Sequence, residues 1–215
     1  MMLGLDTSGK NLGLAVCNKG EVITSSLTQP GLRHGEILQQ RIDGFLSGSN
    51  LSLDDLTGVS VTLGPGSFTG LRIGLAAAKG YCYALNIPLT GISTLSAGAG
   101  FISPKAAKTA VIIDAMRDEF YYALFDSSGP TPRRLIPDSV GPMANLYDII
   151  DDKTIIFGPE HLMEQFVAQF DHSDYHISDS LNLAETAGLI GEENAEIREY
   201  LEMAEAIPIY LRSGI

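Results

Sequence analysis

This 215-residue sequence has few cysteines, few basic residues and only short apolar runs. Two cysteines, Cys17 and Cys82, are too few for a disulfide framework, and they show neither CxxC spacing nor metal-type neighbours. No apolar run reaches the roughly 18 residues of a transmembrane helix. The first residues, MMLGLDTSGK, lack the basic and apolar regions of a signal peptide. These absences predict a cytoplasmic protein whose two thiols are free and buried.

Apolar material for a core, by contrast, is plentiful. Hydrophobic residues make up 45% of the chain and charged residues 19%, a balance that excludes disorder as the main state. The length fits one large domain or two small lobes.

The net charge of −12 is unevenly spread along the sequence. Residues 1–108 hold 8 Lys or Arg and 6 Asp or Glu, a charge of +2, whereas residues 109–215 hold 6 and 20, a charge of −14. This division suggests two lobes with different surface duties. An acidic surface that only keeps the protein soluble is the alternative. The acidic half speaks against direct nucleic-acid binding there, because Lys and Arg make most phosphate contacts.

Hydrophobic patterns predict alternating strands and helices in the first half of the chain. Short apolar runs bounded by turn residues indicate strands, and apolar residues three and four apart indicate helices. We expect strands at residues 2–5, 12–17, 21–28, 58–63 and 88–92, helices at 34–47 and 71–85, and another helix starting between 93 and 100.

The second half of the chain repeats this order. Val111–Asp114 is an apolar run that ends in aspartate, as Leu3–Asp6 is, and in each case a second apolar run begins six residues later. Ile155–Pro159 similarly resembles Val61–Pro65. The pattern indicates an internal duplication, with a coincidence of common β patterns as the alternative.

The repeat places two lobes along the sequence, at residues 1–102 and 103–215. The acidic stretch after Asn182 is amphipathic, so we expect a helix there that Pro208 ends. This helix falls within the second predicted lobe.

A glycine-rich turn, Gly64-Pro65-Gly66-Ser67-Phe68-Thr69-Gly70, joins a predicted strand to a predicted helix. Backbone N–H groups and the helix dipole at such a turn can bind an anion. The turn is neither a Walker A loop nor a nucleophile elbow, because no Gly-Lys-Ser/Thr follows and Pro65 stands where the elbow needs glycine. Capping of the next helix by Ser67 or Thr69 is the structural alternative. Gly64, Gly66 and Ser67 are the candidate anion or nucleotide residues of this turn.

Asp6, Thr7 and Ser8 follow a strand end, where a carboxylate can hold a magnesium-bound water or a substrate hydroxyl. Asp114 is the corresponding residue of the second half, and turn formation explains either aspartate equally well. His172 and His176 have the spacing of two ligands on one helix face. Their segment is polar and turn-like, so a surface loop or an edge strand is the better interpretation.

The helix predicted at residues 71–85 has a face of small residues that lets another backbone approach closely. Packing against the chain's own sheet is one interpretation, and packing against a second chain is the other. With the neighbouring predicted helix, the second interpretation gives a candidate partner surface. Its residues are His34, Ile37, Leu38, Arg41, Phe45, Gly70, Leu71, Gly74, Ala78 and Tyr81.

Six short motifs run from one end of the chain to the other. They are LGLDTS at residues 3–8, GPGSFTGLRIG at 64–74, AKG at 78–80, GISTL at 91–95, DAMR at 114–117 and PIYLR at 208–212. Together they resemble the TsaB (YeaZ) family, and the glycine-rich block is quite specific. The resemblance implies an α/β fold of the actin/Hsp70/sugar-kinase-like (ribonuclease H-like) superfold, with two duplicated lobes that each contain a mixed sheet flanked by helices.

The same resemblance implies a role in tRNA modification. TsaB is the bacterial partner of TsaD in forming threonylcarbamoyladenosine (t6A) next to the anticodon, and the ATPase TsaE completes the assembly. We therefore expect a non-catalytic scaffold that binds TsaD through helices 33–47 and 70–85 and forms a homodimer when TsaD is absent. The tRNA would be reached only through the complex. No resident cofactor is expected, although a nucleotide at a complex interface stays open.

The resemblance also implies that a metal site is missing. TsaD-like proteins hold a catalytic metal with His-x-x-x-His, and Thr94 and Gly98 stand at the aligned positions. Neither residue can replace an imidazole ligand. The alternative function is an active nucleotide-dependent phosphotransferase or peptidase of the same superfold, which would use Asp6, the 64–70 turn and Asp114.

Overall fold

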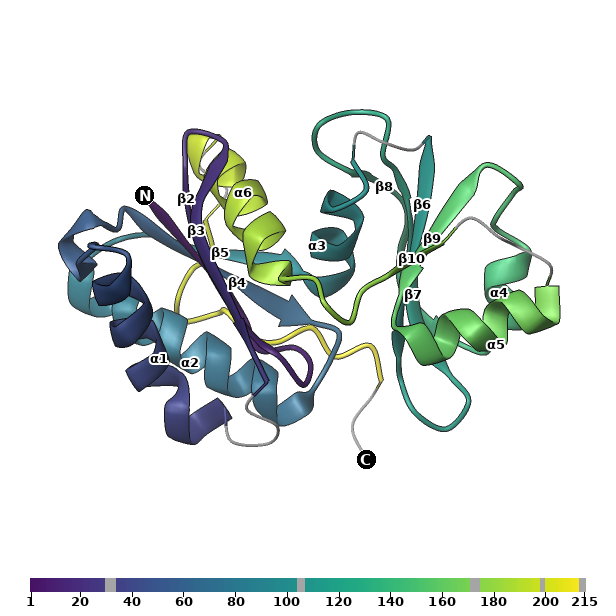
Figure 1. The fold of residues 1–215 in the computed structure, drawn as a ribbon, viewed down its shortest axis with the longest axis horizontal. Coiled ribbons are helices and arrows are strands. Elements are labelled where there is room, and N and C mark those ends of the chain that lie inside the picture. The colour runs from purple at the N-terminus through teal and green to yellow at the C-terminus, as the bar shows by residue number, and fades with distance from the viewer. Residues whose placement is uncertain (30–33, 104–106, 171–174, 198–199, 213–215) are drawn as a thin grey trace. The chain divides into compact units, whose positions relative to one another are not determined.

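Two compact units form the chain, each with its own five-stranded mixed sheet (Figure 1). The computed structural model describes residues 1–29, 34–103, 107–170, 175–197 and 200–212. The first unit comprises Met1–Ala97 and Asn182–Ile209, and the second comprises Gly98–Leu181 and Tyr210–Ile215. This architecture confirms the predicted fold class of two α/β lobes. None of the described helices is long and apolar enough to span a membrane.

The first unit has the strand order β3-β2-β1-β4-β5. Antiparallel pairing joins β1, β2 and β3, and parallel pairing adds β4 and β5. Its elements are β1 (Met2–Asp6), β2 (Leu12–Asn18), β3 (Glu21–Thr28), α1 (His34–Gly48), a 3-10 turn (Leu53–Asp55), β4 (Gly58–Gly64), α2 (Phe68–Leu85), β5 (Leu89–Ser93) and α6 (Leu183–Glu196). The short α3 (Thr94–Gly100) contains the boundary between the units.

Helices cover both faces of this first sheet: α1 and α2 lie on one face and α6 on the other (Figure 1). Alternation along the strands explains the division. Leu3 and Leu5 of β1 pack with Leu38 and Leu75 of the two helices in one buried cluster. Gly4, between the two leucines, faces α6.

Helix α6 touches the sheet backbone, which only small residues allow. A Cβ atom placed on Gly4 would lie 2.1 Å from the carbonyl oxygen of Ala184, and one on Gly191 would lie 2.4 Å from the Ser60 side chain. Ser60 Oγ donates a hydrogen bond of 2.6 Å to the carbonyl of Ala187. The helix is therefore an integral layer of the first unit.

Asn182 fastens the start of α6 to the hairpin of β2 and β3. Its side-chain amide donates to the carbonyls of Leu14 and Ser26, at 3.0 and 3.2 Å, and its Oδ1 accepts from the N–H of Ala184. At the other end of the helix, the Glu192 carboxylate accepts from the N–H groups of Lys19 and Gly20 at the hairpin turn.

These contacts correct the lobe boundaries expected from the sequence. The predicted break after residue 102 lies near the observed one after Ala97, but residues 182–209 return to the first unit. The helix also ends at Glu196, well before Pro208. Beyond it, the N–H groups of Leu201 and Ile209 donate to the carbonyls of Leu89 and Leu63, so this segment borders β4 and β5.

The return of residues 182–209 also removes the predicted charge asymmetry. Each unit contains 7 Lys or Arg and 13 Asp or Glu, so each carries −6 of the −12 total. The first half of the sequence seemed nearly neutral because it leaves out residues 182–209 of the first unit. That segment contains seven of the acidic residues of the unit.

The second unit repeats the plan of the first, with the strand order β10-β9-β6-β7-β8. Again a three-stranded antiparallel meander is extended by two parallel strands. Its elements are β6 (Lys108–Asp114), β7 (Phe120–Asp126), β8 (Arg133–Gly141), α4 (Ala144–Tyr147), β9 (Thr154–Gly158), α5 (Glu160–Phe170) and β10 (Tyr175–Ile177). The duplication seen in the sequence is therefore confirmed.

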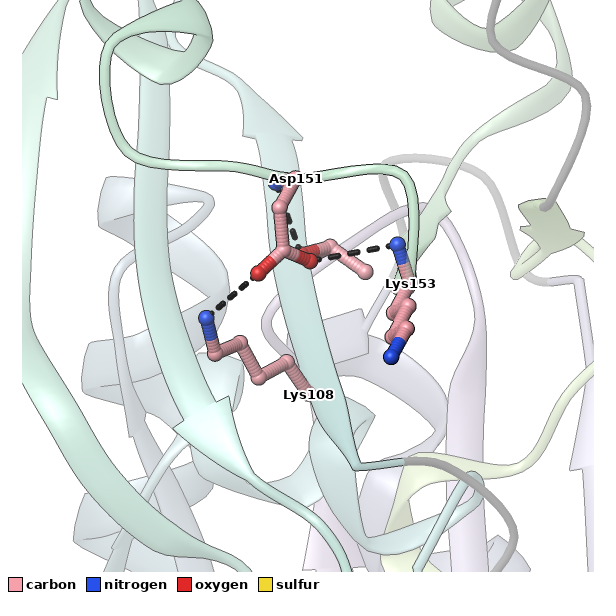
Figure 2. A network of polar contacts seen from close by, with 4 residues as sticks. Lys108, Asp151 and Lys153 are labelled. Carbon is pink, nitrogen blue, oxygen red and sulfur yellow. Dashed lines mark hydrogen bonds and ion pairs between the residues drawn. The ribbon is translucent and has the colours of Figure 1, made fainter.

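A polar network lies at the first residues of the parallel strands β6 and β9 in the second unit (Figure 2). Asp151 lies at its centre: one carboxylate oxygen accepts from Lys108 Nζ at 2.6 Å, and the other accepts from Thr154 Oγ1 and the N–H of Lys153. The bond from Lys108, followed by that from Thr154, lowers the pKa of Asp151 to about 2. The charged form of Asp151 thus holds the turn that leads into β9.

We predict that Asp151→Asn destabilises the protein at neutral pH and makes it less sensitive to acid. The Asp151 pKa is lower in the folded chain, so its contribution is present above the unfolded pKa of about 4. That contribution is lost as the pH falls towards about 2. Urea unfolding followed by circular dichroism between neutral pH and pH of about 2 measures this, with Asp152→Asn as the control of equal charge change. Identical acid profiles for the two variants would contradict the role of the network.

Candidate functional site

The turn after β1 holds the candidate residues Asp6, Thr7 and Ser8, and all three are buried. Asp6 Oδ1 accepts hydrogen bonds from the N–H of Ser8 at 3.0 Å and from Thr62 Oγ1 at 2.6 Å. The first bond closes an Asx turn, and the second ties the carboxylate to β4. These bonds explain Asp6 as the residue that fixes the turn.

The glycine-rich turn of residues 64–70 packs directly against Thr7 and Ser8. Gly66, with a φ of +158°, would place a Cβ 2.4 Å from the carbonyl oxygen of Ser8, and Gly70 would place one 2.1 Å from that of Thr7. The N–H of Ser67 donates to the carbonyl of Ser8 at 2.6 Å, and Thr7 Oγ1 donates to that of Gly70 at 2.8 Å. The structure thus brings the two predicted motifs together.

Within the turn, Ser67 acts as the N-cap of α2. Its Oγ accepts from the N–H of Gly70 at 3.2 Å, which is the capping geometry that the sequence offered as the alternative to anion binding. Pro65 has no N–H, and the N–H of Ser67 is used by Ser8. A packing and capping role therefore accounts for the hydroxyl and for the glycines at 66 and 70.

Asp114 occupies the same position in the second unit. Its Oδ1 accepts from the N–H of Met116 at 2.6 Å, which repeats the Asx turn of Asp6 and Ser8. Its Oδ2 lies 3.4 Å from Nε2 of His161. Met116, Arg117 and Asp118 then have φ values near +60°, an uncommon conformation for residues other than glycine.

Thr94 and Gly98, which the family resemblance places where TsaD-like proteins have metal-binding histidines, carry no imidazole in this chain. Thr94 is buried, and its hydroxyl has no hydrogen-bond partner among the described residues. A Cβ at Gly98 would lie 2.8 Å from the Val111 side chain and 3.0 Å from that of Phe157, so the neighbours fill the space of a longer side chain. His176 lies in the exposed edge strand β10, one of the two settings expected for it, whereas His172 falls outside the described residues.

The small-residue face of α2 is internal, which corrects its assignment to a partner surface. A Cβ at Gly74 would lie 2.2 Å from Thr7 Oγ1, and Ala78 is completely buried. Leu71 and Tyr81 are buried with them. The sequence left two interpretations open, and the structure supports the first: this face packs against the chain's own first unit.

The predicted partner residues on α1 fall into two groups. His34 and Leu38 are buried, and His34 Nε2 lies 3.1 Å from the carbonyl of Asn11. Ile37, Arg41 and Phe45 lie on another side of the helix, where they line a groove beside β3. The sequence did not distinguish these groups, because both follow the same helical spacing.

Both cysteines are buried free thiols, as expected. Burial raises the pKa of Cys17 to about 12 and that of Cys82 to about 11, so neither is a thiolate at neutral pH. Glu192 and Glu185 add to the effect at Cys17. These thiols have the properties of core residues and not those of nucleophiles.

Comparison with known proteins fits this fold and these motifs. A family model described as "TsaD: tRNA N6-adenosine threonylcarbamoyltransferase" matches residues 29–180. The "tRNA threonylcarbamoyladenosine biosynthesis protein TsaB" of Bacillus subtilis (strain 168) is 29% identical over 159 residues, which cover 71% of this chain and 66% of that protein. The chain belongs to the TsaB (YeaZ) branch of the TsaD family.

Other members of the TsaB (YeaZ) branch show the same likeness. The TsaB protein of Escherichia coli (strain K12) is 33% identical over 124 residues, 57% of this chain and 53% of that protein. The alignments thus span just under two thirds of the Bacillus subtilis protein and about half of the Escherichia coli protein. The structure of YeaZ from Pseudomonas aeruginosa matches 98% of this chain and 99% of its own, with a TM-score of 0.82 at 24% identity. That match supports the fold of two α/β units, each with a mixed sheet.

We predict that Gly74→Ala lowers the free energy of unfolding by about 1–3 kcal/mol, the usual cost of overpacking a core. The added methyl group would clash with Thr7. Gly80→Ala, on the same helix, is the matched control, because a Cβ there meets nothing within 4 Å. The control should gain up to about 1 kcal/mol from helix propensity. Urea unfolding of both variants measures the difference, and equal stabilities would show that Gly74 does not face Thr7.

Proposed function

We propose that the chain is a non-catalytic scaffold subunit in t6A biosynthesis that binds TsaD and supports threonylcarbamoyl transfer to tRNA. The role of the TsaB relatives in tRNA threonylcarbamoyladenosine biosynthesis and the match to the TsaD family model support this proposal. The residues of the candidate site support it as well: Asp6, Thr7 and Ser67 make hydrogen bonds within the fold. Thr94 and Gly98 offer no ligands for the metal of a TsaD-like centre.

The partner face that we propose is the exposed side of α2, and it is the observation on which the TsaD proposal depends. Phe68, Arg72, Ala76 and Gly80 follow one another at four-residue steps, and Tyr83 continues the same side. Residues at this spacing share one helix face. The side chain of Tyr83 is 82% exposed and that of Phe68 is 54% exposed. Exposure of two large aromatic side chains on the same face of one helix is uncommon.

The chemistry of this α2 face suits helix packing. Arg72 lies over the Phe68 ring, with its Cζ 3.7 Å from the ring centroid, so the two side chains form a cation–π pair. Ala76 and Gly80 lie between this pair and Tyr83 and let a second helix approach to about 8 Å, the short end of the usual range. Tyr and Arg are the residue types that most often anchor interfaces.

The proposal includes two further partners, a second copy of the chain and TsaE. We propose that two copies of the chain associate through it when TsaD is absent, and that TsaE joins the TsaD-bound form. The two helices expected to bind TsaD, residues 33–47 and 70–85, stay in the proposal. The exposed face of α2 and the side of α1 beside α2 now replace the buried residues Gly74 and Ala78.

We predict that Tyr83→Ala weakens TsaD binding at least about tenfold, or 1.4 kcal/mol. The variant removes an exposed anchor and leaves the core intact, so its melting temperature should stay near that of the wild type. Gly80→Leu should weaken binding similarly, because its side chain would hold the partner helix away. Calorimetric titration with TsaD and a t6A-forming assay with TsaD, TsaE and tRNA measure both effects.

Tyr175→Ala is the control for this experiment, since Tyr175 is also exposed but lies in the second unit. Melting should be compared at several protein concentrations, because a homodimer gains stability with concentration. Wild-type TsaD affinity in both α2 variants would place the interface elsewhere. ATP hydrolysis by the purified chain alone would instead favour the phosphotransferase alternative.

We also predict that the isolated chain binds tRNA poorly at physiological salt. Each unit carries −6, so its net charge opposes binding to the phosphates of tRNA, which depends mostly on Lys and Arg. Addition of TsaD should raise the tRNA affinity. Electrophoretic mobility shifts with and without TsaD measure this, and tight binding by the chain alone would overturn the indirect role.

A further inference from the structure

A groove lies beside α1 in the first unit, lined by residues of this helix and of the strands β2 and β3. Figure 1 labels these three elements in the first unit. Its volume is about 600 Å³, in the range of small-molecule sites. Strand β3 is the edge strand at this side, and no further strand in the described part of the chain borders the groove. The groove is therefore open to a ligand from solvent.

The groove is lined by both apolar and polar side chains. Leu14, Ile37 and Phe45 provide apolar surface, and all three belong to or pack against the main hydrophobic cluster of the first unit. Ser26 and Thr28 add hydroxyl groups from alternate positions of β3. The groove thus offers an apolar base with hydrogen-bonding groups at one side.

Among the residues that the structure describes, Arg41 is the one charged residue that lines the groove. The side chain is exposed, and within the described ranges no residue forms an ion pair or hydrogen bond with it. No Asp or Glu is among the lining residues. In a chain with 26 acidic residues, an arginine without a carboxylate beside it leaves a local site for an anion.

We propose that this groove binds a carboxylate carried on an apolar body, with the carboxylate on Arg41 and the apolar part against Leu14, Ile37 and Phe45. A guanidinium matches the geometry of a carboxylate with two parallel N–H bonds. A single cation balances a carboxylate monoanion, whereas a phosphate dianion would leave one negative charge uncompensated in an acidic protein.

Gly44 keeps the groove open. It lines the groove, and a Cβ placed on it would meet nothing within 4 Å. A larger side chain there would enter the groove without a clash, so the site can be filled while the fold is preserved.

The groove is separate from the α2 face proposed for TsaD. Gln39 of α1 donates a hydrogen bond to the Tyr81 hydroxyl, and Gly35 lies against Ile73, so α2 borders the side of α1 that carries residues 35 and 39. Residues 37, 41 and 44 lie on the opposite side of a helix with 3.6 residues per turn. Binding in the groove and binding to TsaD can therefore be tested independently.

The test is a nuclear magnetic resonance titration of the full chain with N-acetyl-L-phenylalanine, which combines a carboxylate with an apolar ring. We expect saturable shifts at the amides of Ser26, Thr28, Gln40 and Arg41. The neutral N-acetyl-L-phenylalaninamide should bind at least about tenfold more weakly, and Arg41→Gln should reduce the affinity for the acid by a similar factor.

Gly44→Leu should abolish binding of the acid, whereas Gly48→Leu, another open position on the same helix, should leave it unchanged. Thermal unfolding of each variant verifies that it is folded. Absence of saturable shifts up to the solubility limit, equal affinity for acid and amide, or tighter binding of phenyl phosphate would each overturn the proposal.

Discussion

Contact between two backbone segments organises the first unit: the turn of Thr7 and Ser8 lies against the glycines of residues 66, 70 and 74. Carbonyl and hydroxyl groups of the turn occupy the space where side chains of those residues would be. The contact orients α2, because Thr7 donates to the carbonyl of Gly70 and Ser67 caps the helix. The two motifs that identify the family in the sequence are thus two sides of one packing contact. A glycine-rich turn beside a helix N-terminus does not require a phosphate ligand to explain it.

Much of this fold could be predicted from the sequence, because local patterns determine it. The strands of the first half, the helices α1 and α2 and the duplication all follow from hydrophobic periodicity. The return of α6 could not be predicted, since a helix with small residues on one face fits many surfaces, and only tertiary contact selects the sheet at Gly4 and Ser60. Strand β8 was also missed: it is an edge strand with two arginines at its start and Pro137 in its interior, which breaks the usual pattern.

The candidate site shows the same limit. Sequence alone identified Asp6, Ser67 and the glycines as unusual, but it could not distinguish an anion site from a capped and packed turn, because both need the same residue types. On α2 it found the spacing of the small residues and not their direction. A helix whose buried face carries Gly74 and Ala78 and whose exposed face carries Ala76 and Gly80 has small residues on both sides. Only the position of the sheet decides which side is internal.

That two-sided character has a functional consequence. Because Gly70 and Gly74 let α2 pack directly on the turn after β1, this contact determines which face of the helix is exposed. A binding face that is already ordered loses less conformational entropy when a partner binds. The balance of charge points the same way: with −6 on each unit, long-range attraction to nucleic acid is weak. The association that we propose for α2 must then depend on short-range contacts, which are the kind that Phe68, Arg72 and Tyr83 can provide.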